Sequence, residues 1–389
     1  MNDTTRPIIS AARHAERLER AVAATAAHGL DAMLVGVGPD LRYLTGYQAM
    51  PLERLTMLVI SPRGPAIVVP RLERAAAETG VQGDVEILTF DEGADPYGLV
   101  VQRIGNAHAG IASIAVSDTL WASHLLGIQG AIGRDARFRS ADIGVASTVL
   151  RDLRMVKDAD EIELLRLAAH AADRVVAQIA SGRLVGRTEA DVSKEVRDRL
   201  LAEGHEQAEF AIVGSGPNSA SPHHEASERV IEAGEPIVLD IGGHLSGYGS
   251  DITRTLWVTG GDATKGPDDG FRHLFGVLHE AQAAATRAVG SGVPCEAVDA
   301  AARRPIDAAG YGDAFFHRTG HGIGLEGHED PYIIGGNTEP LRVGMAFSVE
   351  PGIYLVGRYG ARIEDIVVCG PDGPITLNEA PRELYVVDG

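Results

Sequence analysis

Cysteine and basic residues are both scarce in this sequence, and each scarcity excludes a class of protein. Cys295 and Cys369 are the only cysteines among 389 residues, so no disulfide framework can be inferred. The 35 lysines and arginines are outnumbered by 54 aspartates and glutamates, which gives a formal net charge of −19. This balance argues against nucleic acid or an anionic membrane as a partner, because both require a positively charged surface.

Long apolar runs are also missing from the chain. No stretch of about 18 apolar residues is present, so the sequence predicts no membrane-spanning helix. The first residues lack the uninterrupted apolar core that is typical of a signal peptide. We therefore expect a cytoplasmic protein. Hydrophobic residues still make up 44% of the chain, which is enough for a sizeable core.

The pattern of apolar residues changes near residue 150 and predicts two domains. Over residues 1–150, apolar runs alternate with helical patterns, which is typical of an α/β domain. No catalytic constellation is found in that part. Over residues 151–389, two pairs of long helices are separated by strand-rich stretches. The second domain is therefore expected to be α+β, with its helices packed on one antiparallel sheet.

The helices of the second domain are predicted from their caps. Asp158 and Glu161 have the spacing of a capping box, and Thr188 is placed to cap the next helix. Two further helices are expected at about 268–289 and 294–309.

The first of two predicted hairpins carries a pair of aspartates. The segment PIVLDIGGHLSGYGSDITRTLWV has two β-branched runs around a Gly/Ser turn, which is a strong hairpin signal. A turn centred between Leu245 and Ser246 places Asp240 directly opposite Asp251. Like charges in that arrangement are destabilising unless something neutralises them.

The second predicted hairpin repeats this arrangement with glutamates. The segment AFSVEPGIYLVGRYGARIEDIVV turns around Gly357, which places Glu350 opposite Glu364. Four carboxylates on apolar strands are costly to bury unless a cation compensates them. The two hairpins together therefore predict a cation site.

A histidine in the segment HRTGHGIGLEGHEDP, residues 317–331, adds a nitrogen ligand to these oxygens. His321 has glycines on both sides, so little side-chain bulk keeps an ion away from it. On this segment alone, a flexible polar loop is an equally good interpretation. Carboxylates with one imidazole suit Mn²⁺, Co²⁺, Fe²⁺ or Zn²⁺. Because four carboxylates exceed the needs of one ion, we predict two ions that share carboxylates and activate a water molecule.

These residues resemble the metal-dependent pita-bread peptidases, which comprise Xaa-Pro dipeptidase (prolidase), Xaa-Pro aminopeptidase and methionine aminopeptidase. The matching segments are SPHHEASERVIEAGEPIVLDIGG, GYGSDITRT, GHGIGLEGHEDP, SVEPGIY, GARIED, YLTGY and LRMVKDADEIELLR. The resemblance implies a pita-bread catalytic domain at 151–389, preceded by a creatinase/prolidase-like domain at 1–150. Methionine aminopeptidases lack that first domain, so its presence favours a proline-directed enzyme and a homodimer.

The resemblance implies five metal ligands and two divalent ions. The ligands are Asp240, Asp251, His321, Glu350 and Glu364. Asp251 and Glu364 are expected to bridge the ions. Mn²⁺ or Co²⁺ is expected, with Zn²⁺ or Fe²⁺ as alternatives.

The resemblance also implies roles in substrate binding and catalysis. His223, the first histidine of SPHH, matches an active-site histidine outside the metal ligands. His328 matches a histidine that holds the substrate carbonyl or the tetrahedral intermediate. Glu350 matches a residue that shuttles a proton in addition to binding metal.

Four further residues near these motifs receive other interpretations. His224 is interpreted as a solvated neighbour of the active-site histidine, and His317 as structural. Arg362, two positions before a predicted ligand, is expected to orient carboxylates. Some prolidases have an arginine just after the HExP segment, where it meets the carboxylate of a dipeptide, but Tyr332 occupies that position here. Tyr332 is therefore the expected substrate contact, and the resemblance does not decide between dipeptides and longer peptides.

The expected activity is hydrolysis of the bond between an N-terminal residue and proline, in a dipeptide or a longer peptide. One alternative is a hydrolase or lyase that acts on a small non-peptide substrate on the same scaffold. Another is a binding module without catalysis. Creatinase-like members do without metals and the binding-module relatives lose ligands, whereas all five ligand positions are filled here.

Overall fold

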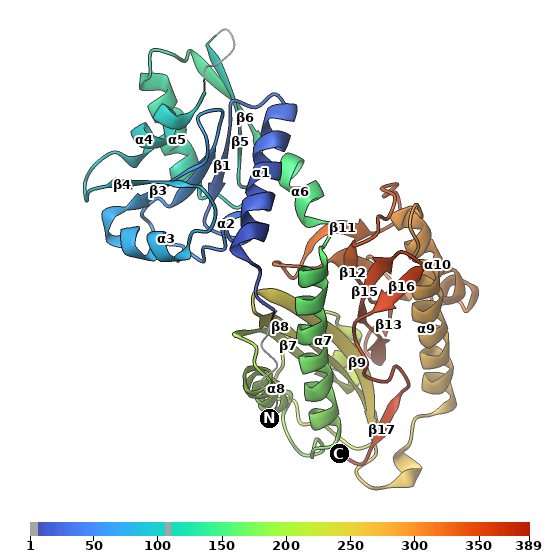
Figure 1. The fold of residues 1–389 in the computed structure, drawn as a ribbon. Coiled ribbons are helices and arrows are strands. Elements are labelled where there is room, and N and C mark those ends of the chain that lie inside the picture. Colours follow the sequence, from blue (N-terminus) through green and yellow to red (C-terminus); the bar gives the residue numbers. More distant parts are fainter. Residues whose placement is uncertain (1–6, 106–109) are drawn as a thin grey trace. The chain divides into compact units, whose positions relative to one another are not determined.

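A computed structural model describes residues 7–105 and 110–389 of the chain. They form two compact units, one of Ile8–Arg154 and one made mainly of Met155–Gly389 (Figure 1). Within the described ranges, no helix is both long and apolar enough to cross a membrane.

The first unit is built on one mixed sheet with the strand order β4-β3-β2-β1-β5-β6. Its strands are β1 (Ala32–Gly36), β2 (Met57–Ile60), β3 (Ala66–Pro70), β4 (Glu86–Phe90), β5 (Ile111–Val116) and β6 (Ser140–Val145). Its α-helices are α1 (Ala11–Ala27), α2 (Pro39–Thr45), α3 (Arg74–Gly80), α4 (Pro96–Arg103), α5 (Ala122–Arg134) and α6 (Ser147–Arg154). Apolar side chains of α4 and α5 pack on those of the sheet. The predicted α/β class of this part is confirmed.

Residues 155–389, all of them described, contribute four long helices and eleven strands to the second unit. The helices are α7 (Ala159–Ala180), α8 (Glu189–Ala202), α9 (Asp269–Ala288) and α10 (Cys295–Ala308). The strands are β7 (Gln207–Ser215), β8 (Glu235–Leu245), β9 (Tyr248–Val258), β10 (Gly320–Gly322), β11 (Glu329–Ile333), β12 (Ala346–Val349), β13 (Gly352–Leu355), β14 (Tyr359–Arg362), β15 (Asp365–Gly370), β16 (Gly373–Thr376) and β17 (Tyr385–Val387). The predicted caps are present, because Asp158 and Glu161 form a capping box on α7 and Thr188 caps α8.

The strands of the second unit divide into three sheets, so the predicted single antiparallel sheet is wrong. Their orders are β17-β9-β8-β7, β11-β10-β12-β15-β16 and β13-β14. β17 also runs parallel to β9, so one sheet is mixed. Helices α7 and α8 bury apolar side chains against β7, β8 and β9. Helices α9 and α10 do the same against β12, β13 and β15 (Figure 1). The α+β class stands, with two helix-covered layers.

The first hairpin forms with a register that differs from the predicted one by two residues. Asp240 pairs with Thr253, and Gly242 pairs with Asp251. The turn is centred between Ser246 and Gly247, both of which have positive φ values, 52° and 83°. Two-residue hairpin turns of this kind require positive φ at both central positions. Because side chains alternate with a period of two, the shift leaves both aspartates on one face.

The second hairpin has the predicted register, but it is interrupted where its two glutamates lie. β12 pairs with β15 and β13 pairs with β14, while Glu350 and Glu364 fall between the two ladders. Pro351 lies in this gap and has no N–H to donate to a ladder. The glutamate N–H groups bond elsewhere, Glu350 to Thr319 O at 2.8 Å and Glu364 to Thr253 O at 3.1 Å. The interruption therefore attaches the second hairpin to β9 of the first.

All four carboxylates point away from the helices, for one local reason. Each has a chain neighbour whose apolar side chain lies in a helix-covered core. These neighbours are Leu239 and Ile241 for Asp240, Ile252 for Asp251, Val349 for Glu350 and Ile363 for Glu364. Since successive side chains of an extended chain face opposite ways, the carboxylates meet on the faces that the helices leave uncovered.

Candidate metal centre

The contact between β9 and the interrupted hairpin brings the two pairs of carboxylates together. Besides the backbone bond from Glu364, Thr253 donates its hydroxyl to Glu364 Oε2 at 2.7 Å. Arg254 donates from Nη1 to the carbonyl of Glu364 at 2.6 Å. These bonds fix Glu364 beside the aspartates of the first hairpin.

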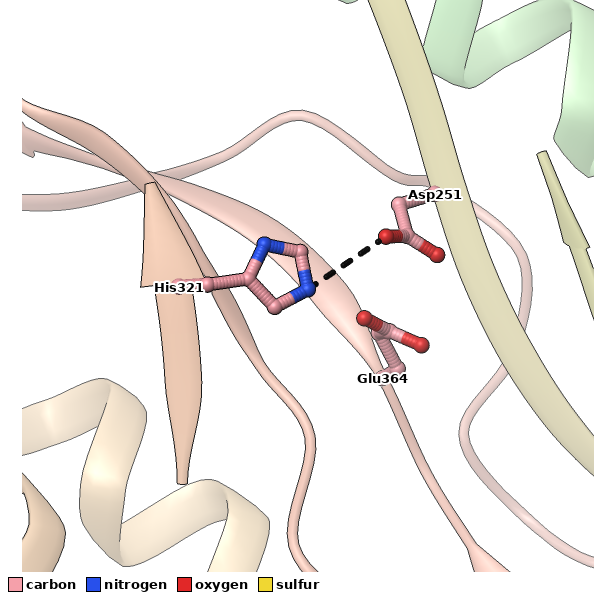
Figure 2. Close-up of side chains that lie close together, drawn as sticks. All are labelled: Asp251, His321 and Glu364. Carbon is pink, nitrogen blue, oxygen red and sulfur yellow. Dashed lines mark ion pairs between the residues drawn. The ribbon is translucent and has the colours of Figure 1, made fainter. Parts of the chain in front are cut away.

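Three predicted ligands form a compact group in the structure. Ligand atoms of Asp251, His321 and Glu364 all lie within 4.8 Å of one another, and Figure 2 shows the two carboxylates facing the imidazole. His321 Nε2 lies 3.6 Å from Asp251 Oδ2 and 3.3 Å from Glu350 Oε1. All of these residues are buried except Glu350, which is half-buried. We call Asp240, Asp251, Glu350 and Glu364 the carboxylate cluster.

The glycines around His321 allow its strand to pack closely. A Cβ at Gly320 would lie 1.8 Å from the carbonyl oxygen of Ser348, and one at Gly322 would lie 2.2 Å from that of Asp330. His321 Nδ1 donates to the carbonyl of Gly322 at 3.1 Å. This bond leaves Nε2 with a free lone pair toward the carboxylates, as in metal-binding histidines that donate their other nitrogen to a carbonyl.

Asp240 is held in place by the buried guanidinium of Arg362. Arg362 Nη2 donates to Asp240 Oδ2 at 2.5 Å, and Arg362 also donates to the hydroxyls of Tyr354 and Thr253. Asp240 Oδ1 is buried without a protein hydrogen-bond partner. This oxygen is therefore available to a ligand of another kind.

The carboxylate cluster holds more carboxylates than the single positive charge of Arg362 can neutralise. Burial, followed by the charges of neighbouring carboxylates, raises the pKa of Asp251 and that of Glu364 well above their usual values. Burial raises the pKa of Glu350 to about 7, although Arg362 opposes this shift. Burial, followed by electrostatic repulsion between the two imidazoles when both are protonated, lowers the pKa of His321 to about 3. A neutral imidazole beside several uncompensated carboxylates is the donor set that a divalent cation requires.

A cavity of approximately 680 Å³ opens onto the carboxylate cluster. All five predicted ligands line it, as do His223 and His328. The imidazole rings of His321 and His328 lie 3.9 Å apart. His321 is buried, whereas His328 and His223 are exposed to the cavity. The seven-residue spacing thus places one histidine among the carboxylates and the other where a substrate can contact it.

Arg318, which no sequence pattern singled out, also lines this cavity. Its Nη2 donates to His328 Nδ1 at 3.4 Å, and its guanidinium lies 4.5 Å from the ring centre of Tyr332. Tyr332 is not among the residues that line the cavity, so it reaches the cavity only through Arg318. His317 bonds to the hydroxyl of Tyr354 at 2.9 Å and to the carbonyl of Arg318 at 2.7 Å. These bonds agree with a structural role for His317.

His224 is not a solvated neighbour, contrary to the sequence interpretation. It donates from Nε2 to the carboxylate of Glu189 at 2.7 Å. Glu189, the first residue of α8, is fully buried. The same carboxylate accepts bonds from the backbone and hydroxyl groups of Ser215 and Ser227. Glu189 therefore anchors the segment that carries His223, and its place directly after the predicted cap Thr188 gave no sign of this.

Replacing Glu189 with glutamine should weaken the folded state in a pH-dependent way. Burial opposes ionisation of Glu189, but bonds from Ser227, His224 and Ser215 prevail and lower its pKa from 4.5 to about 2. Because the folded pKa is depressed, this stabilisation is present above pH 4.5 and is lost as the pH falls toward 2. The shift corresponds to about 3 kcal/mol. Urea unfolding of the parent protein and of Glu189→Gln at pH 7 and pH 3 measures the difference in their free energies of unfolding.

The matched control for this experiment is Glu280→Gln, at an exposed position paired with Arg287 on α9. Surface ion pairs contribute less than about 1 kcal/mol, so this variant should follow the parent protein at both pH values. A constant difference between Glu189→Gln and the parent from pH 7 to pH 3 would contradict the assigned role of Glu189.

Comparison with known proteins agrees with this arrangement. The model of metallopeptidase family M24 matches residues 163–371, and that of the creatinase/prolidase N-terminal domain matches residues 17–156. The probable dipeptidase PepE of Mycobacterium tuberculosis is 46% identical over 378 residues, which cover 96% of this chain and 96% of that protein.

Two solved structures extend the comparison to the fold. The crystal structure of dipeptidase PepE from Mycobacterium ulcerans is 44% identical and has a TM-score of 0.87, covering 97% of this chain and 99% of the other. The crystal structure of prolidase from Thermococcus sibiricus is 34% identical and has a TM-score of 0.86. The match covers 95% of this chain and 98% of the other. The resemblance to pita-bread peptidases is confirmed, and the family name implies divalent metal ions. This chain belongs to metallopeptidase family M24, carries a creatinase/prolidase N-terminal domain, and is an enzyme.

Proposed function

We propose that this enzyme hydrolyses the peptide bond between an N-terminal residue and proline, with two divalent ions held by Asp240, Asp251, His321, Glu350 and Glu364. Mn²⁺ or Co²⁺ is the proposed metal, since four of the five ligands are carboxylates. The similarity to proteins named prolidase and dipeptidase supports this choice of substrate class.

One observation carries the proposal, namely that the carboxylate cluster and an apolar surface share one cavity. Phe210, Phe316 and Ile334 line the same cavity as the predicted ligands. Phe316 is 60% exposed and Ile334 is 42% exposed, although both are large apolar side chains. Proline presents an apolar ring and, in a peptide bond, no N–H. Apolar contact is therefore the recognition that such a substrate needs.

His328 is proposed to donate a hydrogen bond to the oxygen of the scissile carbonyl. An arginine can only donate, so the bond from Arg318 makes His328 Nδ1 an acceptor. The proton of the neutral ring then lies on Nε2. Burial, together with the charge of Arg318, lowers the pKa of His328, which favours this neutral form.

The remaining residues would orient the substrate and move a proton. When bound, divalent ions in such a site polarise a carbonyl and make a water molecule more acidic. Glu350, half-buried at the edge of the carboxylate cluster, is proposed to accept the proton of the attacking water and deliver it to the departing proline nitrogen. Arg362 holds Asp240 in place. His223 is proposed to contact the substrate, and Tyr332 acts from beneath Arg318.

A homodimer and a cytoplasmic location are also proposed, on the grounds given by the sequence. Sedimentation of the purified protein and fractionation of cells that produce it test these two points. A hydrolase or lyase of a small non-peptide substrate stays the alternative function.

Removal of metal should abolish activity toward Xaa-Pro substrates. We expect protein dialysed against chelator to be inactive, and Mn²⁺ or Co²⁺ to restore hydrolysis of Ala-Pro but not of Ala-Ala. The reason is that the carboxylate cluster and His321 leave donor atoms free for cations. Steady-state hydrolysis with Mn²⁺, Co²⁺ and Zn²⁺ in turn is the measurement. Full activity in protein shown by metal analysis to be empty would contradict the proposal, and equal rates on Ala-Ala would contradict the proline preference.

A further inference from the structure

Two arginines line the cavity, and they have different surroundings. Arg362 is buried and bonded to Asp240, Tyr354 and Thr253. Arg318 is half-buried, and in the described part of the chain no carboxylate forms an ion pair with it. One of its N–H groups donates to His328 and its flat face lies over Tyr332. A guanidinium has five N–H donors, so most of those on Arg318 are available to a ligand.

Tyr332 gives the guanidinium a fixed orientation. The distance of 4.5 Å from the guanidinium carbon to the ring centre is typical of a cation stacked on an aromatic face. Stacking leaves the edge of the guanidinium, with its paired N–H groups, free to bind in its own plane. A carboxylate is the ligand that matches such a pair of donors.

The position of Arg318 relative to His328 defines which carboxylate could reach it. Nη2 lies 3.4 Å from His328 Nδ1, on the opposite side of the ring from the nitrogen assigned to the scissile carbonyl. The guanidinium therefore lies beyond the imidazole, about one ring width farther from the scissile carbonyl than Nε2 is. In a dipeptide, the terminal carboxylate follows the scissile bond by a single residue, which spans about 3.8 Å. In a longer peptide, an uncharged amide occupies that place.

We propose that Arg318 binds the C-terminal carboxylate of a dipeptide substrate, and that this contact makes the enzyme prefer Xaa-Pro dipeptides to longer peptides. The inference rests on the proposed function. Some prolidases have an arginine at the position that Tyr332 occupies here. In this chain Arg318, in the segment before β10, would supply that positive charge.

The test compares an acid substrate with its amide on the parent enzyme and on Arg318→Met. We expect the parent to hydrolyse Ala-Pro with a kcat/KM about 10²-fold higher than that for Ala-Pro amide. The reason is that the amide has no carboxylate to form an ion pair with Arg318. In Arg318→Met this ratio should fall to about 3 or less, mainly through a higher KM for Ala-Pro. Ala-Pro-Ala should behave like the amide on both proteins.

The ratio separates this role from a structural one. If Arg318 only positioned His328, the variant would lose the same factor on the acid and on the amide, and an unchanged ratio would overturn the inference. Tyr332→Phe keeps the ring beneath the guanidinium and should keep the parental ratio, whereas Tyr332→Ala should lower it. A parent enzyme that cleaves none of the proline substrates would instead refute the proposed function, and a parent ratio near 1 would refute the inference alone.

Discussion

Replacing Glu364 with alanine should remove at least one of the two proposed ions and lower activity by at least about 10³-fold, since metal polarisation of the reacting groups is worth several kcal/mol. Glu364 Oε2 accepts a hydrogen bond from the hydroxyl of Thr253. Ligand atoms of Glu364, Asp251 and His321 all lie within 4.8 Å of one another. If Glu364 serves both ions, as expected from the sequence, its neighbours cannot replace it. Metal analysis after gel filtration, together with kcat for Ala-Pro, gives both readouts.

The same substitution should affect the stability of the metal-free protein in the opposite direction. Burial, followed by repulsion from Glu350 and Asp240, raises the pKa of Glu364, so removing this carboxylate relieves electrostatic repulsion within the carboxylate cluster. We expect metal-free Glu364→Ala to have a higher Tm than the metal-free parent, and to gain less from added Mn²⁺. Two tightly bound ions per chain in this variant would show that Glu364 does not bridge.

Replacing His321 with alanine and replacing His328 with alanine should impair the enzyme in different ways. His321→Ala should lower metal occupancy and activity together, and extra metal should restore part of the loss, because Nε2 of this residue faces the carboxylates. His328→Ala should keep both ions and lose about 10²–10³ in kcat, the usual cost of removing one donor to a developing oxyanion. Metal content and kinetics measured side by side distinguish the two residues. Loss of metal in His328→Ala, with both ions kept in His321→Ala, would reverse the assignment.

Local sequence patterns were sufficient to predict the four long helices of the second unit and the strand faces that carry the carboxylates. The capping box at Asp158 and the cap at Thr188 depend only on residues three positions apart. The position of Asp240 between Leu239 and Ile241 was enough to place its carboxylate opposite an apolar core. The two-residue error in the first hairpin came from the turn at Ser246 and Gly247, and the period of two made it harmless to the predicted face.

What the sequence could not predict depends on contacts between segments that are distant in the chain. The interruption at Pro351 splits a hairpin because its glutamate N–H groups find partners in other segments. Glu189 and His224 are 35 positions apart, and nothing in either local pattern connects them. Arg318 lies only three positions before His321, yet its access to the cavity follows from the stacking on Tyr332 in a neighbouring strand. Periodicity and capping cannot report such pairings.

Anomalous diffraction from crystals grown with Mn²⁺ tests the proposed metal centre most directly. We predict two peaks per chain, roughly 3.5–4 Å apart as in other two-metal sites. Both should lie among Asp240, Asp251, His321, Glu350 and Glu364, with Glu364 in contact with each. A single peak, peaks away from these residues, or no peak at a Mn²⁺ concentration that fully supports activity would contradict the proposed centre.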